Sequence, residues 1–292
     1  MKCAIVTDTS ANLPLRMVTQ YGLTVIPFSY YVEGKENVCT DIEAFDGAGY
    51  YSAMRAGGLV TTSQITPQRY LDAIEPLLAE GQDILFIGMS SGISGSFSSA
   101  RLAMMQLAER YPERKLRLVD TRGASLGEGL LVLRAAEMLR GGASIDETAA
   151  RVRALRERMC QVFTVDDLMY LRRTGRLSNA AAVVATLLRI KPLLIGDEMG
   201  RIVNFAKASG RRRAVEALAQ RYDEHVVNPK EQIVGIAQAD CPEDAQYLRE
   251  LLCRSNPPKE ILTVCYEPVT GAHVGPGALA LFFLGGEDAR SH

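Results

Sequence analysis

The sequence predicts an α/β protein of two domains, the first built on a mainly parallel sheet flanked by helices and the second a mixed α/β domain. Strand-like and helix-like segments alternate along the first half of the chain. The run Ile84–Met89 is apolar throughout, which is typical of a strand buried on both faces of a parallel sheet. Strand-like and helix-like segments also both occur in the second half, which predicts a mixed α/β domain there. We place the boundary so that the domains span residues 1–154 and 155–292.

The N-terminal elements follow from apolar periodicity and from the residues that begin and end helices. Pro14 and Pro67 stand where helices can begin, since proline fits the first helical turn. Glycine pairs at 57–58 and 141–142 end two helical patterns. The expected strands are 5–6, 23–28, 84–89 and 116–119, with a hairpin from 29 onwards, and the expected helices begin near 12 and span 42–56, 66–80, 96–109 and 124–139.

The C-terminal elements are predicted in the same way. The segment Ser144-Ile145-Asp146-Glu147 resembles a capped helix start, and that helix runs to about Met159 and links the two halves. The turn Asp197–Gly200 separates two strands. The expected strands are 161–165, 192–195, 202–206, 233–237, 261–265 and 278–284, and the expected helices are a short one ending at 173, then 180–188, 214–222 and 243–253.

Composition excludes several classes of function. The 33 basic and 34 acidic residues give no reason to expect a nucleic-acid partner. The six cysteines form no Cys-x-x-Cys pair and have no histidine at zinc-site spacing, so we expect no metal and a reduced, cytoplasmic protein. No apolar stretch approaches the length of a membrane span, and the N-terminal apolar run is too short for a signal peptide.

Three polar clusters, each predicted to be a turn beside an apolar segment, carry the candidate chemistry. They are Thr61-Thr62-Ser63-Gln64, Ser90–Ser96 and His273-Val274-Gly275-Pro276-Gly277. The second follows the strand 84–89, so it falls where open α/β sheets bind ligands. Hydroxyls and free N–H groups meeting at one point would hold a carboxylate or phosphate with an apolar body. Each cluster also has a purely structural interpretation: Ser94 or Ser96 capping its own helix, Thr62 entering a helix, and His273 in a surface turn.

A serine hydrolase is the enzymatic alternative. Gly88-Met89-Ser90-Ser91-Gly92 fits the Gly-x-Ser-x-Gly nucleophile elbow, and Ser90, Asp240 and His273 follow the chain order of α/β-hydrolases. Against this, Gly92 and Gly95 interrupt the helix that an elbow requires immediately after its nucleophile. No His-Gly oxyanion motif lies upstream of Ser90.

Together the clusters resemble the DegV family of bacterial fatty-acid-binding proteins, and the resemblance covers nearly the whole chain. The matching motifs are Val6-Thr7-Asp8-Thr9-Ser10, Thr62-Ser63-Gln64, Ser90-Ser91-Gly92-Ile93-Ser94-Gly95, Tyr170-Leu171-Arg172-Arg173-Thr174-Gly175-Arg176, Ile190-Lys191-Pro192 and His273-Val274-Gly275-Pro276-Gly277. Each motif is modest alone, but six in this order and spacing are specific.

The resemblance implies one long-chain fatty acid, such as palmitate, in a tunnel between the domains. It implies that Thr62 and Ser94 bond the carboxylate with His273 nearby, while Gly95 allows the backbone to approach closely. The acid would be presented to a separate ATP-dependent kinase that forms an acyl phosphate. The chain would thus be a lipid carrier without catalytic residues or a cofactor, touching membranes only transiently. A regulatory module with an incidental lipid is a further alternative.

Basic and apolar residues outside the three clusters also have predicted roles. Arg172, Arg173 and Arg176 are predicted either to dock an acidic or phosphorylated partner or to form a solvated helix end. The aliphatic and aromatic candidates to line a tunnel are Val183, Val184, Leu187, Leu188, Leu279, Leu281, Phe282 and Phe283. Three positions depart from the family pattern, namely Thr174, Ser209 and Phe97, where the family often has Gly, Arg and Tyr. The residue at 209 puts the kinase step in question, although Lys207 or Arg211 offers a substitute charge.

Overall fold

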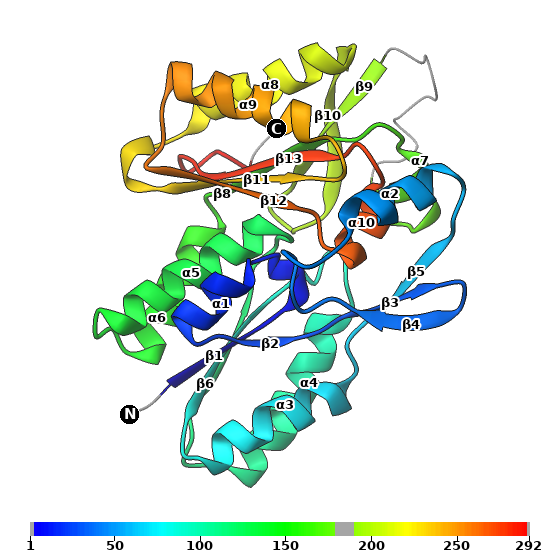
Figure 1. Ribbon diagram of the computed structural model, residues 1–292. Coiled ribbons are helices and arrows are strands. Elements are labelled where there is room, and N and C mark those ends of the chain that lie inside the picture. The colour runs from blue at the N-terminus through cyan, green and yellow to red at the C-terminus, as the bar shows by residue number, and fades with distance from the viewer. Residues whose placement is uncertain (1–2, 179–189, 291–292) are drawn as a thin grey trace.

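A computed structural model describes residues 3–178 and 190–290, and its two larger sheets form the centres of two domains (Figure 1). The N-terminal sheet is parallel and four-stranded in the order β2-β1-β6-β7. Its strands are β1 (Cys3–Asp8), β2 (Thr24–Ile26), β6 (Asp83–Gly88) and β7 (Leu116–Asp120). A short 3₁₀ turn, η1 (Thr9–Ala11), follows β1. The predicted parallel sheet is therefore confirmed.

Helices cover both faces of this sheet. The helices are α1 (Leu15–Tyr21), α3 (Pro67–Ala79), α4 (Ser96–Arg110), α5 (Leu126–Arg140) and α6 (Ile145–Arg156). Ile84 and Phe86 of β6 pack with the α3 and α4 layer, while Leu85 and Ile87 pack with the α5 and α6 layer. Because successive side chains of a strand alternate between faces, a sheet covered on both sides requires the continuous apolar run seen in the sequence.

A small antiparallel sheet in the order β4-β3-β5 stands beside the first and differs from prediction in two places. Its elements are β3 (Ser29–Val32), β4 (Lys35–Val38) and β5 (Val60–Ser63), with helix α2 (Gly47–Arg55) between β4 and β5. The segment predicted to be a turn at Thr61–Gln64 is largely strand, because Thr62 pairs with Tyr30 and β-branched residues suit strands. Helix α2 begins five residues later than predicted, because the Asp46 carboxylate caps it by accepting the Gly49 N–H.

The C-terminal sheet is mixed and six-stranded, in the order β10-β9-β8-β13-β11-β12. Its strands are β8 (Met159–Thr164), β9 (Ile190–Gly196), β10 (Ile202–Ser209), β11 (Ile233–Gln238), β12 (Glu260–Cys265) and β13 (Leu279–Leu284). Helices α8 (Arg211–His225) and α9 (Pro242–Ser255) cover the face turned away from the N-terminal domain (Figure 1). The remaining helical pieces are α7 (Met169–Arg173), α10 (Pro268–Val274) and the 3₁₀ turn η3 (Pro229–Glu231).

Helix α10 was not predicted, and it corrects the assignment of His273 to a turn. The helix begins at Pro268, and the Glu267 carboxylate caps it by accepting the N–H groups of Val269 and Thr270. Because α10 is only seven residues long and contains Gly271, it gives almost no periodic signal. The helix predicted at 180–188 lies outside the described residues. The domain boundary between residues 154 and 155 remains a prediction.

Candidate functional site

The two domains enclose a cavity of about 180 Å³ at the carboxyl ends of the parallel strands. The loops after β6 and β7 and the end of β5 line it from the N-terminal domain. Residues of β8, β9, β10, β13 and α10 line it from the other domain. The predicted site residues Thr62, Ser94, Gly95 and His273 all line this one cavity, although they are far apart in the chain.

Thr62 and His273 meet directly across the domain boundary. The Thr62 Oγ1 and His273 Nε2 atoms lie 2.9 Å apart. Burial, together with the charges of Arg176 and Arg173, lowers the pKa of His273 to about 4. The imidazole is therefore neutral at pH 7, and its buried Nδ1 atom has no hydrogen-bond partner among the described residues.

Ser94 lines the cavity and also caps its own helix. Its Oγ accepts the Ser96 N–H at 3.2 Å, which is the helix-capping interpretation, and it donates to Ser96 Oγ at 3.1 Å. Ser96 Oγ in turn accepts the Ile65 N–H at 3.0 Å, which joins this loop to the end of β5. A Cβ atom at Gly95 would overlap Gln64 Oε1, so glycine at this position lets the Gln64 side chain lie against the loop.

The three arginines predicted to form one docking surface are divided by the structure. Arg172 and Arg173 are exposed, and Arg173 lies over the Tyr170 ring at 4.5 Å. Arg176 instead lines the cavity, where its Nε donates to the Ile93 carbonyl at 3.3 Å and its Nη1 to the Thr174 carbonyl. Within residues 3–178 and 190–290, no acidic side chain forms an ion pair with Arg176. Arg176 therefore adds to the cavity wall a positive charge that no acidic side chain of the described residues pairs.

The apolar part of the cavity differs from the predicted tunnel lining. Phe282 lines the cavity as predicted, and Phe163 of β8 lies beside it in the sheet. The other three candidates on β13, Leu279, Leu281 and Phe283, pack in the core beneath α8 and α9. They are wrong because alternate residues of a strand face opposite sides. The candidates Val183, Val184, Leu187 and Leu188 lie outside the described residues.

One side-chain amide stands beside this apolar lining. Gln161 Nε2 donates to the Arg122 carbonyl at 3.1 Å, and its Oε1 accepts the Ala124 N–H at 3.2 Å. A Cβ atom at Gly123 would lie 2.8 Å from Gln161 Nε2, and one at Gly127 would lie 2.5 Å from Oε1. The glycines therefore make room for the amide, which no sequence pattern indicated.

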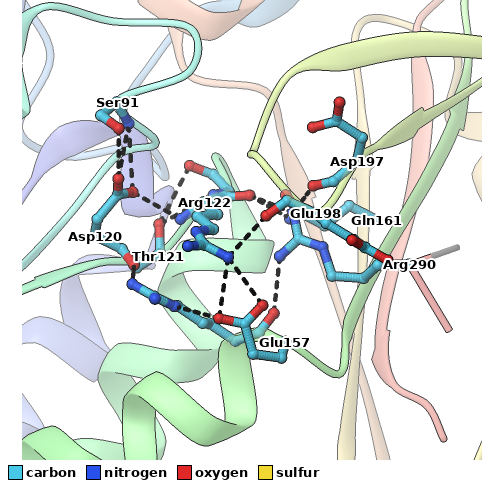
Figure 2. A network of polar contacts seen from close by, with 11 residues as sticks. Ser91, Asp120, Thr121, Arg122, Glu157, Gln161, Asp197, Glu198 and Arg290 are labelled. Carbon is cyan, nitrogen blue, oxygen red and sulfur yellow. Dashed lines mark hydrogen bonds and ion pairs between the residues drawn. The ribbon is translucent and has the colours of Figure 1, made fainter. Parts of the chain in front are cut away.

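A polar network holds the turn between β9 and β10 against the loop after β7 (Figure 2). Arg122 Nη1 donates to the Glu157 carboxylate at 3.0 Å and to the Glu198 carbonyl at 2.9 Å. Arg290, near the end of the chain and only 2% exposed, donates to the carbonyls of Arg122 and Asp197 at 2.7 and 2.6 Å. The network joins the two domains along one wall of the cavity.

The predicted catalytic triad is contradicted by the structure. Ser90 is fully buried, and its hydroxyl donates to the Gly200 carbonyl at 2.8 Å. Asp240 pairs with Arg55, while His273 contacts Thr62. The three side chains therefore have three different partners, and the serine is not accessible to a substrate. The hydrolase interpretation is wrong.

Three buried carboxyl groups were not predicted from the sequence, and two of them, Asp8 and Glu267, line a second and smaller cavity. Burial raises the pKa of Asp8 to about 6 and that of Glu267 to about 7, and it also raises the pKa of Glu128. Glu128 accepts the hydroxyls of Thr7 and Ser10 at 2.9 and 2.5 Å. In the part of the chain that the structure describes, no group of three or more His, Cys, Asp or Glu residues could hold a metal ion.

These features define a class of two-domain α/β proteins with an enclosed polar and apolar site between the domains. The chain belongs to the DegV family: the model of that family, described as an uncharacterised protein, matches residues 2–285. A DegV domain-containing protein of Clostridium perfringens is 39% identical over 284 residues, which cover 97% of this chain and 98% of that protein. None of the described helices is long and apolar enough to cross a membrane.

Solved structures show the same fold. A DegV family protein from Thermus thermophilus, whose structure is described as showing fatty acid binding, is 29% identical with a TM-score of 0.85. DegV from Bacillus subtilis, described as a fatty acid binding protein, is 28% identical with a TM-score of 0.83. Each comparison covers 98% of this chain and 100% of the solved chain.

Proposed function

We propose that this protein binds a single long-chain fatty acid in the cavity between its domains and presents it to a separate kinase. The observation that carries the proposal is the convergence of Thr62, Ser94 and His273 on one cavity with apolar walls. The fatty-acid binding described for the relatives from Thermus thermophilus and Bacillus subtilis supports the same ligand.

The carboxylate would be held by neutral donors and by one nearby charge. The hydroxyls of Thr62 and Ser94 can each donate a hydrogen bond, that of Ser94 by turning away from Ser96 Oγ. The first turn of α4 adds backbone N–H groups and the positive end of the helix dipole. The neutral His273 has one N–H, which on Nε2 donates to Thr62 Oγ1 and so leaves the Thr62 hydroxyl free to donate to the carboxylate. Arg176 compensates the negative charge that this partly buried site would otherwise leave unpaired.

The alkyl chain would supply most of the affinity. Burying a methylene group contributes about 0.8 kcal/mol, so about 14 methylenes contribute a gross 11 kcal/mol. Each charge-assisted hydrogen bond to the carboxylate adds about 1.5–3 kcal/mol before desolvation is subtracted. The tail therefore sets the affinity, and the head group sets the orientation in which the carboxylate is presented.

In the kinase step, a carboxylate oxygen attacks the γ-phosphorus of ATP, the bond to the β-phosphate oxygen breaks, and ADP leaves. The exposed Arg172 and Arg173, beside the His273 end of the cavity, are the candidates to dock the kinase.

Position 209, where the family often has arginine, is exposed at the end of β10 and holds a serine in this chain. Of the nearby basic residues, Arg211 is engaged with Asp244 at 2.7 Å. Lys207 is thus the freer of the two substitutes for a basic residue at position 209.

The first test is to purify the protein from bacterial cells, extract it with organic solvent and identify fatty acid by mass spectrometry. Protein that carries no lipid and takes up neither palmitate nor oleate would contradict the proposal. Thr62→Ala and Ser94→Ala should each weaken palmitate binding roughly tenfold, at about 1.4 kcal/mol per lost hydrogen bond. A double variant that binds as tightly as the unaltered protein would refute the assignment of the head-group residues.

A further inference from the structure

Ser90 lies where the two domains touch at the head-group end of the cavity. Its hydroxyl donates to the Gly200 carbonyl in the β9–β10 turn and accepts the Gly92 N–H at 3.0 Å. A Cβ atom at Gly200 would overlap Ser90 Oγ, and one at Gly92 would lie 2.7 Å from the Met199 carbonyl. The two backbones can therefore meet only because glycine occupies both positions.

The same serine also shapes the loop that carries Ser94. The Ser90 N–H donates to the Gly123 carbonyl at 2.8 Å, and the Ser90 carbonyl accepts the N–H groups of Ile93 and Ser94 at 3.3 and 3.1 Å. One path from the C-terminal domain to Ser94 thus runs through this fully buried residue, beside the bond from Arg176 to the Ile93 carbonyl. Every polar group of Ser90 is used in this path, so none is left for nucleophilic chemistry.

We propose that Ser90 is a positioning residue for the carboxylate site, through which the β9–β10 turn of the C-terminal domain fixes the place of Ser94. The inference rests on the proposed function. It adds that head-group recognition depends on contact between the domains, because the Ser90 hydroxyl joins the Gly200 carbonyl of one domain to the Gly92 N–H in the loop of the other.

Ser91 provides a matched control in the same loop. Its Oγ donates to the Asp120 carboxylate at 2.6 Å, so its bond stays within the N-terminal domain (Figure 2). Ser91 is exposed and does not line the cavity. Ser91→Ala removes one hydroxyl one residue away from Ser90 without touching the contact between the domains.

The test compares palmitate with hexadecanol, which has the same tail and no carboxylate, by displacement of a fluorescent fatty-acid probe. Ser90→Ala should weaken palmitate binding about tenfold and hexadecanol binding less than twofold, while Ser91→Ala should change neither. In the Ser94→Ala background, adding Ser90→Ala should weaken palmitate binding little further, because Ser90 is proposed to act through Ser94. Ser90→Cys keeps a weak donor of similar size, so its palmitate affinity should lie between those of Ser90→Ala and Ser91→Ala. It replaces Ser90→Ala in the test if the alanine variant does not fold.

The outcomes distinguish failure of the proposed fatty-acid binding from failure of the positioning role of Ser90. If the unaltered protein binds neither palmitate nor the probe, the proposed function fails. If it binds both, and Ser90→Ala and Ser90→Cys weaken palmitate and hexadecanol equally or not at all, Ser90 has only a structural role. Additive losses in the Ser90→Ala/Ser94→Ala double variant would likewise overturn the positioning role.

Discussion

Removing Arg290 should destabilise the protein strongly although the residue stands near the end of the chain. Its guanidinium is buried and donates to three backbone carbonyls, those of Arg156, Arg122 and Asp197, at 2.8, 2.7 and 2.6 Å. Two of these acceptors belong to the segments that form the polar network between the domains (Figure 2). Arg290→Ala would leave all three carbonyls without this donor.

The magnitude follows from those three acceptors. A buried polar group that loses its partner costs about 1–3 kcal/mol, and water entering the vacated space lowers that cost toward its minimum. The Arg122 and Asp197 carbonyls each keep a second donor, Gln161 Nε2 and the Gly200 N–H, so the minimum applies. Three lost hydrogen bonds at about 1 kcal/mol each give a loss of about 3 kcal/mol in the free energy of unfolding. At about 2–3 °C per kcal/mol for a chain of this size, Tm should fall by roughly 6–9 °C.

Thermal unfolding followed by circular dichroism measures this loss, with Arg212→Ala as the control. Arg212 is an exposed arginine that pairs with Glu216, and a pair of this kind contributes about 0–1 kcal/mol. Arg290→Lys should recover only part of the stability, because a lysine ammonium group cannot reproduce the planar arrangement of N–H donors with which the guanidinium reaches all three carbonyls. A Tm for Arg290→Ala within about 1 °C of the unaltered protein would refute the reasoning that this side chain joins the domains.

Two further predictions concern the buried groups. The pKa of Glu267 is raised to about 7 in the folded state, so its contribution to stability is present below its ordinary pKa near 4.5 and is lost as pH rises through 7. Urea midpoints of Glu267→Gln should therefore fall less between pH 5 and 8 than those of the unaltered protein, and parallel curves would refute this. Gly127→Ala should cost about 1–3 kcal/mol in urea unfolding because its Cβ would lie 2.5 Å from Gln161 Oε1. Gly141→Ala, with its nearest contact at 3.4 Å, should be close to neutral, and equal losses in both would contradict the packing argument.

Most of the fold could be predicted because burial imposes a pattern on long elements. The strand β6 is apolar at every position that faces a helix layer, and α6 begins at a complete capping box in which Ser144 and Glu147 bond each other's backbone. Short elements were not predicted, because the four residues of β5 and the seven residues of α10 are too few for a period to emerge.

The buried carboxyl groups illustrate a different limit. Nothing local distinguishes Asp8, Glu128 or Glu267 from surface acids, since acidic side chains are mostly exposed. Their burial depends on donors that come from other segments. Glu128, for example, is satisfied by hydroxyls more than a hundred residues earlier in the chain. Such pairing is a property of the tertiary structure and leaves no spacing that a single sequence can reveal.

The separation of Arg176 from its neighbours shows how one backbone angle changes the chemistry of a motif. Arg172 and Arg173 end α7, and both side chains are exposed. Gly175 then adopts φ +70°, a conformation that favours glycine and turns the chain away from the helix direction. Arg176 follows this turn and lines the cavity. Three arginines within five positions read as one basic cluster in the sequence, yet the turn at Gly175 assigns two of them to solvent and one to the proposed carboxylate site.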